Sequence, residues 1–377
     1  MNGNHKKMKE IKSILKKAYR IIVIRYFRIL YGKIEFKNNY KGNIQKFYLK
    51  KNNLQITNKK KYFVSILTNG RICTDSVEQV AYILDNKILN DLSYTQINGK
   101  LTSPKRNFVI KKGTPYFLKK FNGTVLSLAQ GASGDKNYFH WLFDILPKII
   151  IAQSAINFNK IDYFYMPILQ DFQKRILSLL GIKNYKIINS KKIKHLEATK
   201  IVIPSHPWYY KGTIFEEVNS IPEWIVKWLR KSFLKFKKKN IKSLKLFIDR
   251  SESEYSHCKL INNDNIKKIL SKRGFKILQT GKLDFLKQIE LFNNAQFVIG
   301  PHGAAFSNLV FCKPRTNVIE IKPKKQPNNY KKISILNNLN YAQINLKSSK
   351  PKYINEGDMY INPKTLLKLI NILDRKK

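Results

Sequence analysis

Several short stretches of the chain combine residue types that bind phosphates or move protons. The sequence GPHGAAFSN at residues 300–308 follows an apolar run and leads into a helical pattern. Glycine lets a ligand approach the backbone, and the free N–H groups at a helix start attract anions. We therefore expect a diphosphate to contact Gly300, His302, Gly303, Ala304 and Asn308. The alternative is a tight turn whose glycines serve packing alone.

Two charged side chains accompany this stretch in the second half of the chain. Arg250 follows the expected strand 246–249, and a guanidinium at a strand end suits bidentate contact with a phosphate or a base. The alternative is a salt bridge with a neighbouring acid. Glu320 lies within an apolar strand, where a carboxylate needs donors such as the hydroxyls of a ribose. The alternative partner is a lysine such as Lys322.

In the first half, polar residues share one face of an apolar helical pattern. Asn137, His140, Trp141 and Asp144 are spaced i, i+3, i+4 and i+7, and Asp135 lies in the loop before them. We expect this face to line a cleft that holds an acceptor, with Asn137, Trp141 and Asp135 in contact with it. His140 or Asp144 would take a proton from a sugar hydroxyl, or Asp144 would orient His140. The alternative is a helix cap and a core histidine.

The elements that must position these residues alternate most clearly in the second half. Strands separated by short helices predict parallel βαβ units and a doubly wound sheet, with the candidate ligand residues at the strand ends. The first half is less regular, and its prolines and glycine at 204–222 resemble a hinge or linker. The expected strands are 124–129, 162–166, 185–188, 246–249, 275–279, 296–300, 317–321 and 341–346; the main expected helices are 138–155 (kinked at Pro147), 171–180, 223–236, 263–272, 284–294, 329–339 and 363–373.

These patterns divide the chain into an N-terminal segment and an α/β body. Residues 1–40 form a basic segment with helical apolar spacing, which would lie on an anionic membrane surface or pack on the body. Residues 41–215 are expected to form an acceptor-side α/β domain, and residues 216–350 a nucleotide-sugar-binding domain. The C-terminal helix within residues 351–377 is expected to pack back across the interface between them.

Composition limits the function classes further. The 377 residues carry 72 Lys plus Arg against 24 Asp plus Glu, a formal net charge of +48. Of these cations 61 are Lys and only 11 are Arg, whereas a reader of base edges relies on Arg. We therefore expect attraction to anions but no specific nucleic-acid partner. The three scattered cysteines argue against a disulfide framework or a zinc site, and no signal peptide or long apolar run is present.

The chain resembles the glycosyltransferase family 61 group, often described as capsular polysaccharide biosynthesis proteins. The matching elements are NYFHWLFDILP at 137–147, IDRS at 248–251, GPHGAAFSNLVF at 300–311 and VIEI at 318–321. The resemblance implies a GT-B-like architecture of two Rossmann-like halves around a cleft, and inverting transfer from a nucleotide sugar, often UDP-linked. It implies that Arg250 and residues 300–308 handle the donor. Ala305 and Lys148 depart from the usual Gly and Arg.

The sequence therefore predicts an enzyme that transfers a sugar from a nucleotide-sugar donor to a polysaccharide or glycolipid hydroxyl. We expect a cytoplasmic protein, peripheral on the inner membrane face, that builds surface polysaccharide such as capsule or lipopolysaccharide. No metal or other cofactor is expected, because the chain lacks the DxD motif that grips a divalent cation on the donor. The alternatives are a basic module that binds nucleic acid or anionic polymers, and a peripheral scaffold that uses residues 1–40 alone.

Overall fold

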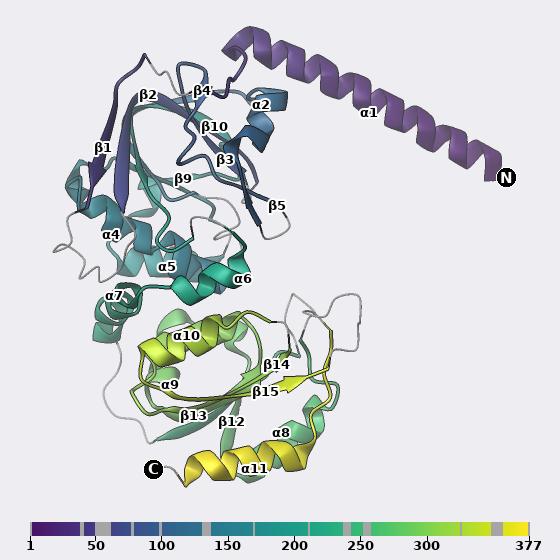
Figure 1. Ribbon diagram of the computed structural model, residues 1–377, viewed down its shortest axis with the longest axis vertical. Coiled ribbons are helices and arrows are strands. Elements are labelled where there is room, and N and C mark those ends of the chain that lie inside the picture. Colours follow the sequence, from purple (N-terminus) through teal and green to yellow (C-terminus); the bar gives the residue numbers. More distant parts are fainter. Residues whose placement is uncertain are drawn as a thin grey trace.

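The protein is a mixed α/β molecule built on two sheets, one of 10 strands and one of 5, with a long N-terminal helix (Figure 1). The architecture is taken from a computed structural model. It describes residues 2–37, 41–49, 62–76, 79–97, 100–129, 137–168, 170–209, 212–236, 243–251, 258–324, 326–347 and 357–375.

The second sheet is parallel throughout and has the strand order β12-β11-β13-β14-β15. Its strands agree closely with the expected ones, because strands buried on both faces read as short apolar runs between turn residues. They are β11 (Leu244–Ile248), β12 (Phe275–Leu278), β13 (Ala295–Pro301), β14 (Asn317–Pro323) and β15 (Asn340–Leu346).

Helices cover both faces of this sheet. Alternate residues of β13 and β14 point to opposite sides: Val298 packs with α9 (Phe285–Asn293) and α10 (Asn329–Leu336), while Phe297 packs with α8 (Asn263–Lys272) and α11 (Pro363–Asp374). The apolar stripe of α11 belongs entirely to this second cluster. The expectation that the C-terminal helix packs back across the interface is therefore wrong.

The first sheet is mixed, and only part of it is parallel. Strands β10, β7, β8 and β9 are parallel, whereas β2 pairs antiparallel with β1, β3 and β10. The sheet consists of β1 (Ile44–Tyr48), β2 (Phe63–Ser76), β3 (Gln79–Leu84), β4 (Lys87–Ile88), β5 (Thr95–Ile97), β6 (Lys100–Thr102), β7 (Lys119–Ser127), β8 (Tyr163–Met166), β9 (Ile187–Asn189) and β10 (His195–Pro204).

The segment expected to be a linker is part of the core. Strand β10 was not expected, yet it lies between β2 and β7 in the sheet. The residues after it are equally enclosed: Ser205, His206 and Trp208 are at most 2% exposed. They lead through α6 (Ile214–Glu217) into α7 (Glu223–Phe233), whose buried face joins a hydrophobic cluster that includes residues of both sheets. Pro204 and Pro207 thus lie in a packed connection and not in a hinge.

The remaining first-half helices are short. They are α2 (Phe108–Lys112), α3 (Tyr138–His140), a π-helix at Trp141–Ile145, α4 (Pro147–Gln153) and α5 (Asp171–Leu179). Cys73, Cys258 and Cys312, all within the described residues, are buried and form no disulfide.

Helix α1 (Asn2–Tyr31) extends away from the body, and its N-terminal end lies far from either sheet (Figure 1). Its last turns join the body, where Phe27 is 7% exposed and contacts the ring of Phe117 at 5.2 Å. The alternative that this basic helix packs on the body along its length is wrong, because residues 10–22 are all exposed. Within the described residues, every helix is too short or too polar to cross a bilayer.

Candidate donor and acceptor site

The strand order of the second sheet marks one place where a ligand can enter. From β11 the chain moves to β12 on one side and then returns to β13 on the other, so the connections diverge between β11 and β13. Open α/β sheets bind ligands in such a position, outside the carboxyl ends of the strands. Arg250 follows β11, and His302 and Gly303 follow β13. The fold thus brings these three residues to one edge of the sheet.

Arg250 and Gly303 depend on each other's shape. The Arg250 guanidinium donates to the carbonyl of His302, and a Cβ at position 303 would overlap its atoms. Gly303 is extended, so its requirement for glycine is steric and not conformational. A Cβ on Gly300 would lie 2.8 Å from the Ile248 Cβ, so this glycine lets β13 approach β11. Both glycines therefore allow a close approach. At Gly300 it is that of strand β11, and at Gly303 it is that of the Arg250 side chain.

His302 contacts a buried acid, Glu320. Its Nδ1 lies 2.5 Å from Oε1 of Glu320, while Oε2 of Glu320 accepts the hydroxyl of Tyr341. Burial and the Glu320 charge raise the pKa of Tyr341. Its hydroxyl therefore stays protonated and donates a hydrogen bond to the carboxylate. Glu320 is 0% exposed, so the structure places it behind His302, away from any ribose at the surface. The Nδ1 atom is thus taken up by the carboxylate, and Nε2 is the other nitrogen of the ring.

Asp249, next to Arg250, is fully occupied by the protein. Its carboxylate accepts from the Ser251 backbone and hydroxyl and from the Asn263 amide, each at 2.9 Å. Burial acts to raise the pKa of Asp249, but these hydrogen bonds and the nearby Lys267 charge outweigh it and lower that pKa. The carboxylate anchors the loop that carries Arg250. The expected alternative of a salt bridge between Asp249 and Arg250 is absent from the described contacts.

The polar helix of the first half changes its winding where the site residues lie. The N–H of Leu146 bonds the Trp141 carbonyl at 3.1 Å, five residues back, which defines a π turn. Pro147 has no N–H to donate to the Phe143 carbonyl, and the indole N–H of Trp208 donates to it instead at 3.1 Å. Such π turns are frequent at functional sites.

His140 and Asp144 form a buried acid–imidazole pair. His140 Nδ1 lies 2.7 Å from Asp144 Oδ2, and Trp208 Nε1 donates to Asp144 Oδ1 at 2.9 Å. His206 Nε2 lies 3.9 Å from the same carboxylate, and its Nδ1 accepts the backbone N–H of Tyr209 at 2.9 Å. The proton of a neutral His206 therefore sits on Nε2, toward Asp144. The side chain of His140 is 16% exposed and that of Asp144 only 4%.

Lys148 is a buried basic residue close to the His140–Asp144 pair. It is 1% exposed, and its Nζ donates to the Ala129 carbonyl at 3.2 Å. Burial lowers the pKa of Lys148 to about 7, against the opposing effect of the Asp144 charge. At this position the chain has the ammonium of Lys148, which bonds backbone carbonyls, in place of the guanidinium that the family resemblance leads us to expect. Lys148, His206 and Trp208 were not expected around Asp144, because two of them lie in the supposed linker.

The two candidate regions lie next to each other. Tyr138 of α3 donates its hydroxyl to Asn308 Oδ1 at 2.7 Å, and Asn308 belongs to the 3₁₀ helix Ala304–Phe311 that follows Gly303. Tyr330 of α10 lies between them, with its ring 6.1 Å from Phe139 and 5.0 Å from His302. The helical segment that carries His140 and the edge that carries His302 are therefore linked through Tyr138, Asn308 and Tyr330.

The other expected residues are placed differently. Ala304 is half-buried at the start of the 3₁₀ helix, whereas Asn308 is fully buried and its amide also donates to Gln288 at 2.8 Å. Asn137 is the exposed N-cap of α3, and Trp141 is fully buried in the core. Asp135 lies outside the described residues. Within the described part, no three His, Cys, Asp or Glu side chains gather as a metal site.

Comparison with known proteins supports one family. Residues 138–319 match the family model Glycosyltransferase 61. The matched segment runs from α3 into β14 and so contains the His140–Asp144 pair, Arg250 and the His302–Gly303 turn. This segment is just under half of the chain, so the match is a similarity to the family 61 glycosyltransferases over that part. Among curated proteins, none matches the chain.

One of the solved structures that align with the chain does so over most of its length. It is the crystal structure of the bacterial iron-containing dodecameric glycosyltransferase TibC from enterotoxigenic E. coli H10407. The two are 12% identical, the alignment covers 90% of this chain and 98% of that one, and the TM-score is 0.37.

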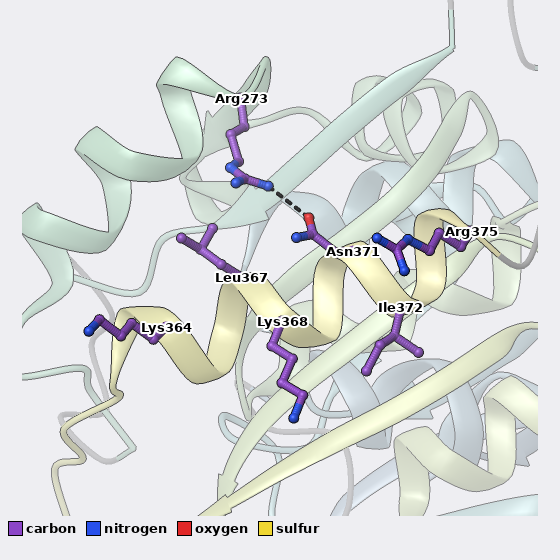
Figure 2. Close-up of a pocket in the computed structure, with 7 residues that line it drawn as sticks. All are labelled: Arg273, Lys364, Leu367, Lys368, Asn371, Ile372 and Arg375. Atoms are coloured by element: carbon purple, nitrogen blue, oxygen red, sulfur yellow. Dashed lines mark hydrogen bonds between the residues drawn. The ribbon is translucent and has the colours of Figure 1, made fainter.

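A surface pocket lies elsewhere on the second sheet's outer layer. It is lined by Arg273 at the end of α8 and by side chains of α11, including Lys364, Lys368 and Arg375 (Figure 2). Arg273 donates to the Asn371 amide oxygen at 3.0 Å across it. The residues that line it do not overlap with the candidate site, so Arg273 provides a control arginine for that site.

Proposed function

We propose that this chain is a glycosyltransferase with a GT-B-like arrangement, which moves a sugar from a nucleotide-sugar donor to a hydroxyl of a polysaccharide or glycolipid acceptor. The observation that carries the proposal is the adjacency of two chemically different groups. Arg250 and His302 lie at the switch point of a parallel sheet, and the helical segment that carries the His140–Asp144 pair contacts the 3₁₀ helix after Gly303 through Tyr138 and Asn308. One supplies cations for a diphosphate, and the other supplies a base for an acceptor.

In this proposal the donor diphosphate lies against Arg250, His302 and the turn at Gly303. The guanidinium gives bidentate contacts, and His302 donates from Nε2 when it is protonated. Free N–H groups at the start of the 3₁₀ helix add further donors near Ala304. These groups stabilise the negative charge that develops on the departing nucleoside diphosphate, without a divalent metal. Glu320 acts through His302 and is a positioning residue.

His140 is the proposed base, and Asp144 orients it. Both oxygens of Asp144 are engaged within the protein, and its side chain is the less exposed of the two. With a proton on Nδ1 directed at Asp144, the lone pair of Nε2 can accept the acceptor hydroxyl proton. The activated oxygen then attacks the anomeric carbon as the nucleotide leaves. A single displacement of this kind inverts the anomeric configuration.

The first test is nucleotide binding by titration calorimetry. We expect UDP or another nucleoside diphosphate to bind, and Arg250→Ala and His302→Ala each to weaken it by about tenfold or more, as loss of a charge-assisted contact requires. Arg273→Ala removes an exposed arginine from the peripheral pocket and should leave the affinity unchanged. Unchanged affinity in both site variants would rule out the donor site.

The second test separates binding from chemistry. Release of nucleoside diphosphate from a panel of nucleotide sugars would reveal the donor, and addition of a chelator would test the proposed independence of metal. His140→Ala should lower turnover about 100-fold or more while nucleotide affinity stays near the wild-type value. If His140→Ala transfers sugar at the normal rate, the base assignment is wrong. Salt-sensitive binding to duplex DNA that ignores Arg250 would instead favour the basic-module alternative.

A further inference from the structure

Helix α1 presents an apolar stripe that no described part of the body covers. Along residues 7–31 its exposed apolar side chains recur at helical spacing, and several are more than half exposed: Ile14 65%, Leu15 62%, Ile22 66% and Ile29 85%. Phe27 and Tyr31, which contact the body, lie on the opposite side of the helix by the 100° step between residues. The stripe therefore faces outward along the whole projection.

The other faces of α1 are strongly basic. The helix contains nine Lys or Arg and a single acid, Glu10, so its formal charge is +8. Lys12, Lys16 and Arg20 are exposed and flank the stripe or lie behind it. A helix with an apolar face and a cationic polar face is the form that lies in the interface of an anionic bilayer. Each cation near such a surface adds to the attraction.

We propose that α1 binds an anionic membrane surface, with the stripe Ile11–Leu15–Ile22–Ile29 inserted between headgroups and the flanking cations against lipid phosphates. Charge complementarity selects this occupant over a second copy of the chain, because two helices of charge +8 repel each other. At 30 residues the helix is roughly 45 Å long, so it anchors the enzyme along a line and not at a point.

This inference does not depend on the proposed sugar transfer, because α1 and the candidate site share no residue. It adds a consequence for the proposed reaction if both hold. An enzyme held at the bilayer meets acceptors at the same surface, which favours a lipid-linked glycan over a free oligosaccharide.

The test measures partition of the full chain onto vesicles at constant protein charge. Ile11→Gln, Ile22→Gln and Ile29→Gln together remove the centre of the stripe and retain good helix formers. The matched control replaces Ile261, Ile335 and Ile372 with Gln, three exposed isoleucines of the body. Neither variant changes the net charge, so attraction of the whole basic chain to anions is the same in both.

Flotation with vesicles of three parts phosphatidylcholine to one part phosphatidylglycerol gives the readout. We expect the partition coefficient of the stripe variant to be about tenfold or more lower than that of the wild type. The partition coefficient of the control should change little. Equal binding of stripe variant and wild type would overturn the proposal. So would a fall in the mass measured by light scattering in the stripe variant without a fall in vesicle binding, since a second copy would then cover the stripe. Nucleotide binding in vesicle-free buffer should be unchanged, which keeps this outcome separate from the donor site.

Discussion

The indole N–H of Trp208 donates to Oδ1 of Asp144 at 2.9 Å, although 64 residues separate them along the chain. The same N–H reaches the carbonyl of Phe143, which Pro147 leaves without its usual helical donor. One side chain thus stabilises the π turn and fixes the carboxylate that contacts His140. We infer that Trp208 is a positioning residue for the proposed base.

Trp208→Phe keeps an aromatic ring in the core and removes this N–H. We expect turnover to fall about tenfold, a part of what a well-placed base supplies, because Asp144 no longer has a fixed orientation. The KM for the donor should change little, because the substitution acts on the orientation of His140 and not on the donor residues. Trp228→Phe in α7 is the control, since this tryptophan packs on the core away from Asp144. Equal losses in both variants would reduce Trp208 to a packing role.

Gly303→Ala places a methyl group where the Arg250 guanidinium lies. We expect the arginine to be displaced, nucleotide affinity to fall about tenfold, and the free energy of unfolding to fall by about 1–3 kcal/mol from overpacking. Combined with Arg250→Ala, the substitution should weaken affinity no further, because both changes remove the same contact. Calorimetry and urea unfolding measure the two effects. Gly281→Ala is the control, since nothing lies within 4 Å of its added methyl; additive losses in affinity would contradict the shared cause.

Glu320→Gln keeps the shape of the buried acid beneath His302 and removes its charge. Because the carboxylate orients the imidazole through Nδ1, we expect nucleotide affinity to fall by about three- to tenfold, a modest share of a charge-assisted contact. Glu290→Gln is the matched control: Glu290 is also largely buried, but it pairs with Lys287 of the same helix at 2.7 Å. Affinity that is unaffected by Glu320→Gln at constant pH would show that His302 does not depend on its buried partner.

Much of the second sheet could be predicted from the sequence, and the reason is physical. Its strands are buried on both faces, so each is a short apolar run, and the turn residues between runs mark the helices. Arg250 and His302 stand at the ends of such runs. Their positions in the sequence therefore predicted that both lie at the same edge of the second sheet. The partner of His302 could not be assigned, because a buried Glu within a strand has several possible donors.

The first half was harder to predict for two reasons. The π turn at Trp141–Ile145 depends on Pro147 and on the distant Trp208, so local spacing alone gave a regular helix. The prolines at 204 and 207 gave a linker, although His206, Trp208 and Tyr209 around them are large residues suited to a core. A histidine among aromatic residues in a supposed linker was the signal that could have found them.

The last prediction concerns the pH dependence that Lys148 imposes on stability. Burial lowers the pKa of Lys148 to about 7 from its ordinary value of 10.5, so the unfolded chain binds a proton more tightly than the folded chain does. Below pH 7 both states are protonated, and the folded state bears the full cost of a buried charge. Between about pH 7 and 10.5 unfolding takes up a proton, and the contribution of Lys148 to stability rises by at most about 1.4 kcal/mol per pH unit.

Lys148→Met keeps the length of the side chain and removes this titration. We expect the free energy of unfolding of the variant to rise less steeply with pH than that of the wild type between pH 7.5 and 9.5. The variant should therefore be relatively most stable at the lower pH. Urea unfolding of both proteins at several pH values measures the difference, in which the titrations of the other lysines cancel. Lys227→Met, on an exposed part of α7, is the control, and a parallel pair of curves for Lys148→Met would show that the buried lysine stays charged throughout.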